Sequence, residues 1–163
     1  MRSTLLSVLL LGATLIAPNV AFADADKDER VPQALTALGY KNFEVSASGT
    51  VRIVLKFDDE RTQGVLIGGN PTQIGALAFR DVYTIAYQSE KSLSPKQMRK
   101  LMEANSTLKI GAWSVRKKGE QYKVMFLASI PADSDKAMLD DVLTFVALVG
   151  DKLERELTGK DDL

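Results

Sequence analysis

The sequence of 163 residues contains neither histidine nor cysteine. Without them the chain cannot form a zinc finger, a histidine-ligated haem site, a disulfide, a Cys-His nucleophile pair or a Ser-His-Asp triad. Any metal site would have to consist of oxygen ligands alone. Basic and acidic residues number 21 each, so the chain also lacks the excess positive charge of many nucleic-acid-binding proteins. We therefore expect no cofactor, no metal ion and no nucleic-acid partner.

The longest hydrophobic run lies at the N-terminus. Leu5 to Ile16 has the length of the apolar part of a signal peptide and is too short for a typical transmembrane helix. Arg2 precedes it, and Ala21-Phe22-Ala23 supplies the small residues of a cleavage site. We predict that residues 1–23 are a cleaved secretory signal peptide. The mature protein would be periplasmic or secreted in a bacterium, without a stable membrane anchor, and the alternative is an uncleaved N-terminal anchor.

Several catalytic motifs are missing as well. The sequence contains no nucleophile elbow G-x-S-x-G, and Gly68-Gly69 lacks the neighbouring residues of a dinucleotide-binding or phosphate-binding loop. The acidic pairs Asp58-Asp59 and Asp140-Asp141 are adjacent residues whose side chains diverge, whereas glycosidases need two carboxyl groups that flank a substrate. We therefore expect no enzymatic activity and no catalytic residues.

Helical signals occur in three places. Ser94 followed by Gln97 is the pattern of a capping box, and Gly39 is a natural left-handed helix end. The expected helices run from Pro32 to Leu38, from the cap Ser94 to about Asn105, and from a cap at Asp133 or Ser134 to about Leu157.

The segments between the helices favour strands, through period-two alternation and turn residues at their ends. They are 43–47, 50–57, 63–67, 74–88 with a bulge at Gly75, 108–116 and 121–130. The order is therefore α-β-β-β-β-α-β-β-α. We predict an α+β fold, with an antiparallel sheet of about five to six strands and helices packed on one face. Residues 31–159 form the domain, residues 24–30 a flexible leader and residues 160–163 a frayed tail.

Apolar spacing in the helices indicates which side faces the core. The last helix has an apolar stripe at helical spacing with Val146 at its middle. Phe145 and Leu148 lie beside this stripe, where they could pack at its edge or extend a partner surface. The second helix is expected to turn three residues to the core: Met98, Leu101 and Met102.

The hairpin of residues 108–130 carries apolar residues on both faces. Alternation places Phe126 with Ile110, Ala112, Tyr122, Val124 and Ala128. The other face carries Trp113, Val115, Met125 and Leu127. If the helices cover one face only, this second set is an exposed patch, and Trp and Met are frequent in interfaces. The candidate partner surface is Trp113, Val115, Met125, Leu127, Phe145 and Leu148; the alternative is that another element covers the Trp113 side.

Basic residues are concentrated in the middle of the chain, between Lys91 and Lys123. Such a region could bind an anionic headgroup, a cell-wall polymer or an acidic protein. A solvated surface that keeps the protein soluble is the alternative.

Several segments of the sequence match a family pattern. They are ALTALGY with NFEV, the strand VRIVLKF, the helix SLSPKQMRKLMEAN, the hairpin KKGEQYKVMFLASI and the closing LDDVLTFVALVGDKLERELTG. From about Val31 to Thr158 the chain resembles the YbjN family, bacterial proteins described as sensory transduction regulators, whose fold is similar to that of type III secretion chaperones. The resemblance implies a small α+β domain without known catalytic residues that binds another macromolecule and often dimerises. The chain departs from the family in its expected signal peptide.

These observations lead to two expectations for function. The first is an exported, non-enzymatic domain that binds a protein partner or self-associates, as a chaperone, adaptor or regulator. The second is a domain that binds a small apolar ligand or a lipid in a groove near Trp113. They require different surfaces, because a protein partner needs a flat apolar patch and a ligand needs an enclosed pocket.

Overall fold

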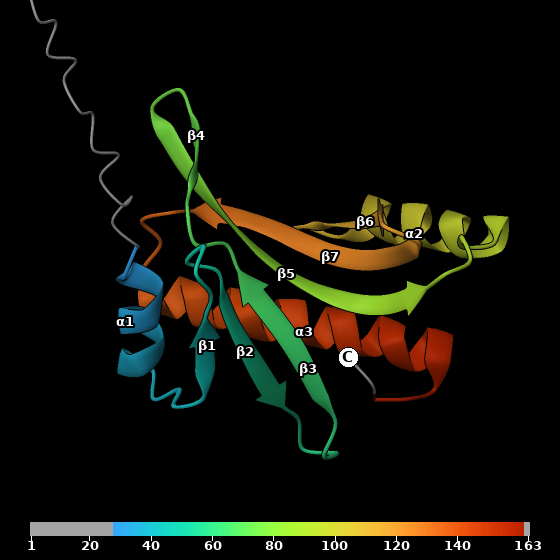
Figure 1. Cartoon of the computed structure of the whole chain (residues 1–163), viewed down its shortest axis with the longest axis horizontal. Helices are drawn as coiled ribbons and strands as arrows, with labels where there is room; N and C mark the ends of the chain where they lie inside the picture. The colour runs from blue at the N-terminus through green and yellow to red at the C-terminus, as the bar shows by residue number, and fades with distance from the viewer. Residues whose placement is uncertain (1–27, 162–163) are drawn as a thin grey trace, which may run out of the picture.

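The computed structural model of the chain describes residues 28–161, which form one antiparallel sheet and three helices (Figure 1). The predicted signal peptide lies outside the described residues, as does the leader before Asp28. The elements are α1 (Arg30–Ala37), β1 (Phe43–Val45), β2 (Val51–Lys56), β3 (Thr62–Ile67), β4 (Thr72–Ile74), β5 (Leu77–Ser89), α2 (Pro95–Thr107), β6 (Ala112–Lys118), β7 (Gln121–Pro131) and α3 (Lys136–Thr158). The predicted α+β class is confirmed.

The strands lie in the order β1-β2-β3-β5-β7-β6, and β4 pairs with β5. The described sheet therefore has seven strands rather than five to six. The additional strand is β4, which shares only Ile74 with the predicted strand 74–88 and begins in the segment before it. Gly75, which has a left-handed φ of 60°, separates β4 from β5. Ile74 pairs with Leu77 across this turn, so Gly75 makes a hairpin and not a bulge. The hairpin projects from the rest of the sheet at the top of Figure 1.

The helix ends follow their capping residues. In α2 the predicted capping box is present: Ser94 Oγ accepts from Gln97 N at 3.3 Å, and Gln97 Oε1 accepts from Ser94 N at 2.9 Å. The start of α3 differs from the prediction, because Asp135 is its cap and accepts from Met138 N at 2.8 Å. Ser134 instead donates to the carbonyl of Pro131. The cap of the last helix is therefore one residue later than Ser134, the nearer of the two expected caps.

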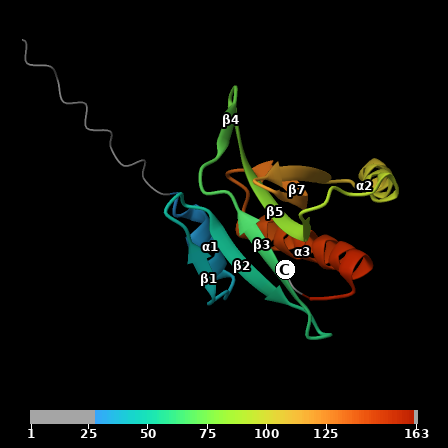
Figure 2. The ribbon, with the colours of Figure 1, turned by 45° about the vertical axis from the view of Figure 1, so that its right-hand side comes forward.

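The core lies between the sheet and α3, which runs along one face of the sheet (Figure 2). Val146 is fully buried there, as its place in the apolar stripe predicts. The helix packs closely against β5 at Gly150, where an added Cβ would lie 2.5 Å from Cγ2 of Thr84. Gln63 of β3 joins the same contact and donates to Thr84 Oγ1 at 2.7 Å, so this buried polar pair ties β3 to β5 under the helix.

The helix α2 lies against the edge strand β6 and not over the centre of the sheet. Leu101 is consequently its one buried residue. Met98 and Met102, which were expected to face the core, are 42% and 70% exposed. Both methionines are exposed because a helix at a sheet edge buries a narrower strip of its surface than a helix that covers a sheet face.

Candidate functional site

The register between β6 and β7 decides which side chains share a face. Trp113 is the cross-strand partner of Phe126, so both side chains point toward α3, as does Val115 two residues further along. Met125 and Leu127 point to the opposite face. The predicted placing of Trp113 and Val115 on the same face as Met125 and Leu127 is therefore wrong.

The sheet face opposite α3 carries two rows of apolar side chains. In the first row Tyr83 of β5 lies between Leu66 of β3 and Leu127 of β7. In the second row Ile85 lies beside Met125. These five residues form what we term the open-face cluster. Met125 is buried, with 8% of its surface exposed, and the other four residues are partly exposed.

Basic side chains border the open-face cluster on β6 and β7. Arg116 pairs across the strands with Lys123, and Lys118 lies two residues further along on the same face. Within residues 28–161 none of the three takes part in an ion pair. Burial raises the pKa of Tyr83 above its ordinary value, and the positive charge of Arg116 opposes this rise. The cluster therefore has a cationic border on one side.

Trp113 belongs to the other side of the sheet, where it is 8% exposed. Its ring centroid lies 5.2 Å from that of Phe126. Asn105 of α2 fixes the backbone at this position, because its Oδ1 accepts from Trp113 N at 2.7 Å and its Nδ2 donates to Trp113 O at 3.1 Å. The amide of Asn105 thus occupies hydrogen-bonding groups that the edge strand would otherwise expose.

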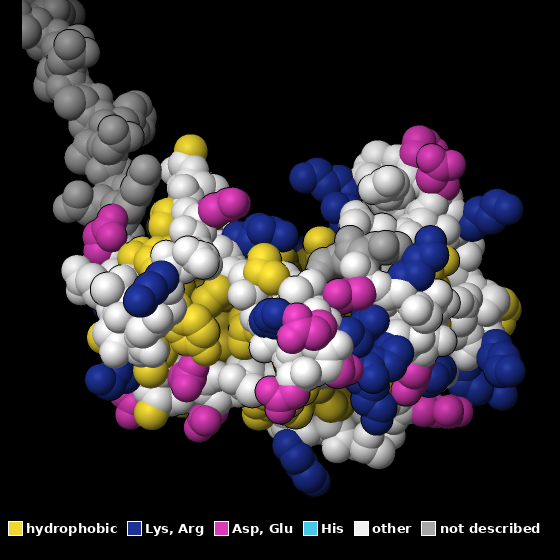
Figure 3. Space-filling model, turned by 90° about the horizontal axis from the view of Figure 1, so that it is seen from below, with side chains coloured by type: hydrophobic (Ala, Val, Ile, Leu, Met, Phe, Trp, Pro, Cys, Tyr) yellow, Lys and Arg dark blue, Asp and Glu magenta, His cyan; other side chains and the backbone are white. Residues whose placement is uncertain are grey.

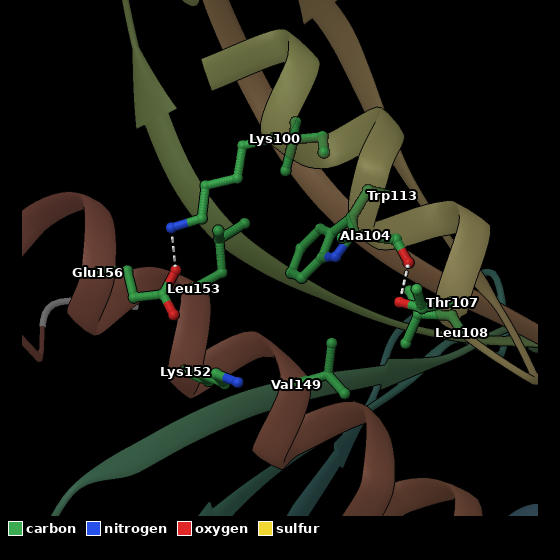
Figure 4. A pocket seen from close by; sticks show the side chains of 10 residues that line it. Lys100, Ala104, Thr107, Leu108, Trp113, Val149, Lys152, Leu153 and Glu156 are labelled. Carbon is green, nitrogen blue, oxygen red and sulfur yellow. Dashed lines mark hydrogen bonds and ion pairs between the residues drawn. The ribbon is translucent and has the colours of Figure 1, made fainter. Parts of the chain in front are cut away.

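A cavity of about 250 Å³ lies beside Trp113, between α2 and the C-terminal half of α3 (Figure 4). Four apolar side chains line it together with the indole ring: Leu101 of α2, Leu108 directly after α2, and Val149 and Leu153 of α3. Lys100 and Glu156 form an ion pair at its border. A pocket therefore exists where the second functional expectation needs one.

The two α3 residues of the predicted partner surface have different surroundings. Phe145 packs against Phe126 in an edge-to-face contact with centroids 5.8 Å apart, and it lies at the border of the core. Leu148 is 51% exposed. Neither lies on the sheet face of Met125 and Leu127, so the six predicted residues do not form one surface.

Charged residues also cluster where β3 begins and α3 ends. Arg61 forms an ion pair with Asp151, and Arg155 binds Asp59 at 2.7 Å and Asp151 at 3.1 Å. The hydrogen bond from Arg155 lowers the pKa of Asp59. Within the described part of the chain, no group of three or more acidic residues is placed to hold a metal ion. We interpret these ion pairs as structural contacts that hold the start of β3 against α3.

The molecular surface seen from below is uneven in character (Figure 3). Hydrophobic side chains gather in the half of the view that contains α1, whereas lysine and arginine are more numerous in the half that contains α2. No helix among residues 28–161 is long and apolar enough to cross a membrane.

Comparison with known proteins gives no match, either to a family model or to a curated protein. The resemblance to the YbjN family therefore stays a prediction.

Sequence reasoning missed three residues of the open-face cluster. Tyr83 and Ile85 had a signal, because their alternate positions in a long strand place them on one face. Leu66 had none, because its place beside Tyr83 depends on the pairing of β3 with β5. The contact of Asn105 with β6 likewise had no sequence signal.

Proposed function

We propose that the chain is an exported, non-enzymatic domain that binds a protein partner through the open-face cluster. The observation that carries the proposal is the presence of two adjacent apolar rows on the sheet face opposite α3, where four of the five side chains are partly exposed. The partner is a protein segment that presents apolar side chains together with acidic residues.

The apolar character of the cluster supports the first half of this proposal. Leu66, Tyr83 and Leu127 form a continuous row across three neighbouring strands. A contiguous apolar surface on a sheet is typical of an interaction site, and Tyr and Met are enriched at the centres of protein interfaces. A partner segment would remove these side chains from water and gain free energy from their burial.

The basic border supports the acidic character of the partner. Arg116, Lys118 and Lys123 lie on the face of the cluster and have no acidic partner among residues 28–161. Acidic residues of a bound segment would complement these charges. Such complementarity accelerates association and selects between partners, and it weakens as salt is added.

Two sets of short synthetic peptides test the proposal. In one set apolar residues alternate with Glu; in the matched set Lys replaces Glu. We expect the Glu peptides to bind more tightly, with an affinity that falls as salt rises. Leu127→Asp should weaken their binding about tenfold or more, because it places a carboxylate in the first row, directly beside Tyr83.

Leu148→Asp is the matched control, because it adds the same charge at an exposed leucine of α3 away from the sheet face. It should leave peptide binding unchanged, and circular dichroism verifies that both variants are folded. Equal binding of Glu and Lys peptides would contradict the proposal. Self-association that Leu127→Asp abolishes, without binding of either peptide set, would also contradict it, because the occupant would then be a second copy of the chain.

A further inference from the structure

The cavity beside Trp113 lies on the side of the sheet opposite the open-face cluster. Its walls are apolar where α2 and α3 face each other, through Leu101 and Leu153, and the indole ring of Trp113 forms another wall. Its volume of about 250 Å³ is slightly below the range of about 300–1,000 Å³ that is usual for small-molecule pockets. The space therefore suits one compact apolar group.

The charges at the border of the cavity are unequal. Lys100 and Glu156 neutralise each other in their ion pair. Lys152 of α3 also lines the cavity, and its ammonium group has no ion-pair or hydrogen-bond partner among residues 28–161. One positive charge thus remains next to the apolar walls (Figure 4).

From this arrangement we propose that the cavity binds a small amphipathic carboxylate, such as a medium-chain fatty acid. The apolar part of the ligand packs against Trp113 and the leucines, and its carboxylate pairs with the Lys152 ammonium. Apolar walls with a few placed polar groups are the usual composition of ligand sites, and the lone charge supplies the preference for an anion. The site is independent of the open-face cluster.

Trp113 is the only tryptophan of the chain, so its fluorescence reports directly on the cavity. Titrations with octanoate, octan-1-ol and octylammonium compare three ligands of similar length that differ in charge. We expect saturable fluorescence changes, with octanoate binding most tightly and octylammonium most weakly. Absence of any saturable change with octanoate would overturn the proposal.

Two variants separate the apolar contribution from the charge. Ala104→Leu fills the cavity from α2, because Ala104 lines it, and we expect octanoate affinity to fall about tenfold. Lys152→Gln should weaken octanoate about fivefold and leave octan-1-ol unchanged, because it removes only the charge. Lys136→Gln is the matched control on the same helix, about 24 Å away at 1.5 Å per residue.

Equal loss of octanoate affinity in Lys136→Gln and Lys152→Gln would overturn the role of Lys152. Unchanged binding in Ala104→Leu would place the ligand elsewhere and overturn the site. Vesicles of phosphatidylglycerol provide the last comparison: a fluorescence change with vesicles but none with octanoate would indicate binding to a membrane surface and would contradict the proposal.

Discussion

Trp113 is a core residue whose ring also forms a wall of the cavity. We predict that Trp113→Ala lowers the free energy of unfolding by about 3–5 kcal/mol, because it removes the contact with Phe126 and enlarges an existing space. Urea denaturation followed by far-ultraviolet circular dichroism measures this change. A loss below about 0.5 kcal/mol, the range of ordinary surface substitutions, would contradict the core position of Trp113 and favour its place on a partner surface.

The position of Trp113 could not be predicted from the alternation alone. Alternation correctly places Ala112 and Trp113 on opposite faces of β6, and Met125 and Phe126 on opposite faces of β7. It does not say which residue of β6 lies opposite Phe126, and a shift of one residue moves every side chain of a strand to the other face. The hydrogen bonds of Asn105 to Trp113, which hold β6 in place, come from a helix whose position is a tertiary property.

Tyr40 donates a hydrogen bond to Asp140 at 2.6 Å and joins the end of α1 to α3. Burial, followed by this hydrogen bond, raises the pKa of Tyr40 to about 12. The ordinary value is about 10, so the stabilising effect is complete below pH 10 and is lost as the pH rises toward 12. We predict that Tyr40→Phe removes the last component of the phenolate absorbance titration. A titration whose last component persists in this variant would contradict the assignment.

Among the elements, α2 is the one whose start is best specified by local sequence. Ser94 caps it in the predicted way, and Ser94→Ala should lower the free energy of unfolding by about 1 kcal/mol. Ser92→Ala, at an exposed serine just before the helix, is the control and should change stability by less than about 0.5 kcal/mol. Equal effects of the two substitutions in urea denaturation would show that the cap contributes no particular stability.

The contact of α3 with β5 depends on a glycine inside the helix. Gly150→Ala would improve helix propensity by about 1 kcal/mol, yet the new Cβ would meet Cγ2 of Thr84 at 2.5 Å. We predict a net loss of about 1–3 kcal/mol, because close packing outweighs propensity here. Leu148→Ala, at an exposed position of the same helix, should stay within about 0.5 kcal/mol. A stabilised Gly150→Ala protein would show that α3 moves freely relative to the sheet.

At the scale of the whole molecule, the class and the order of the elements could be predicted because they depend on local patterns. Hairpins around Gly49 and Gly119 have turn residues that the sequence displays, and both glycines have a positive φ. The pairing of β3 with β5 and of β5 with β7 could not be predicted, because it joins strands that are separated by other elements. The open-face cluster depends on both pairings, so its complete set of residues emerges only in the fold.

The N-terminal segment is joined to the centre of the molecule by an ion pair between residues 52 positions apart, Asp28 and Arg80. Arg80 is 3% exposed and also donates to the carbonyl oxygen of Gly69 at 2.8 Å. The hydrogen bond from Arg30, together with Arg80, holds the pKa of Asp28 well below its ordinary range. Because the folded state favours the carboxylate, Asp28 stabilises the protein above the ordinary pKa of an aspartate and loses this effect in acid.

We predict that Asp28→Asn lowers the free energy of unfolding at neutral pH by about 1–3 kcal/mol, because the buried guanidinium of Arg80 loses its anionic partner. In urea denaturations the difference between the two proteins should stay constant from about pH 7 to about pH 4 and shrink only in stronger acid. Below about pH 4 the unfolded chain takes up a proton at Asp28, whereas the folded protein still holds the carboxylate ionised. Asp58→Asn, at an exposed aspartate, is the control and should follow the wild-type pH dependence. A difference between Asp28→Asn and wild type that stays constant with pH would show that the loss comes from packing and not from the charge of Asp28.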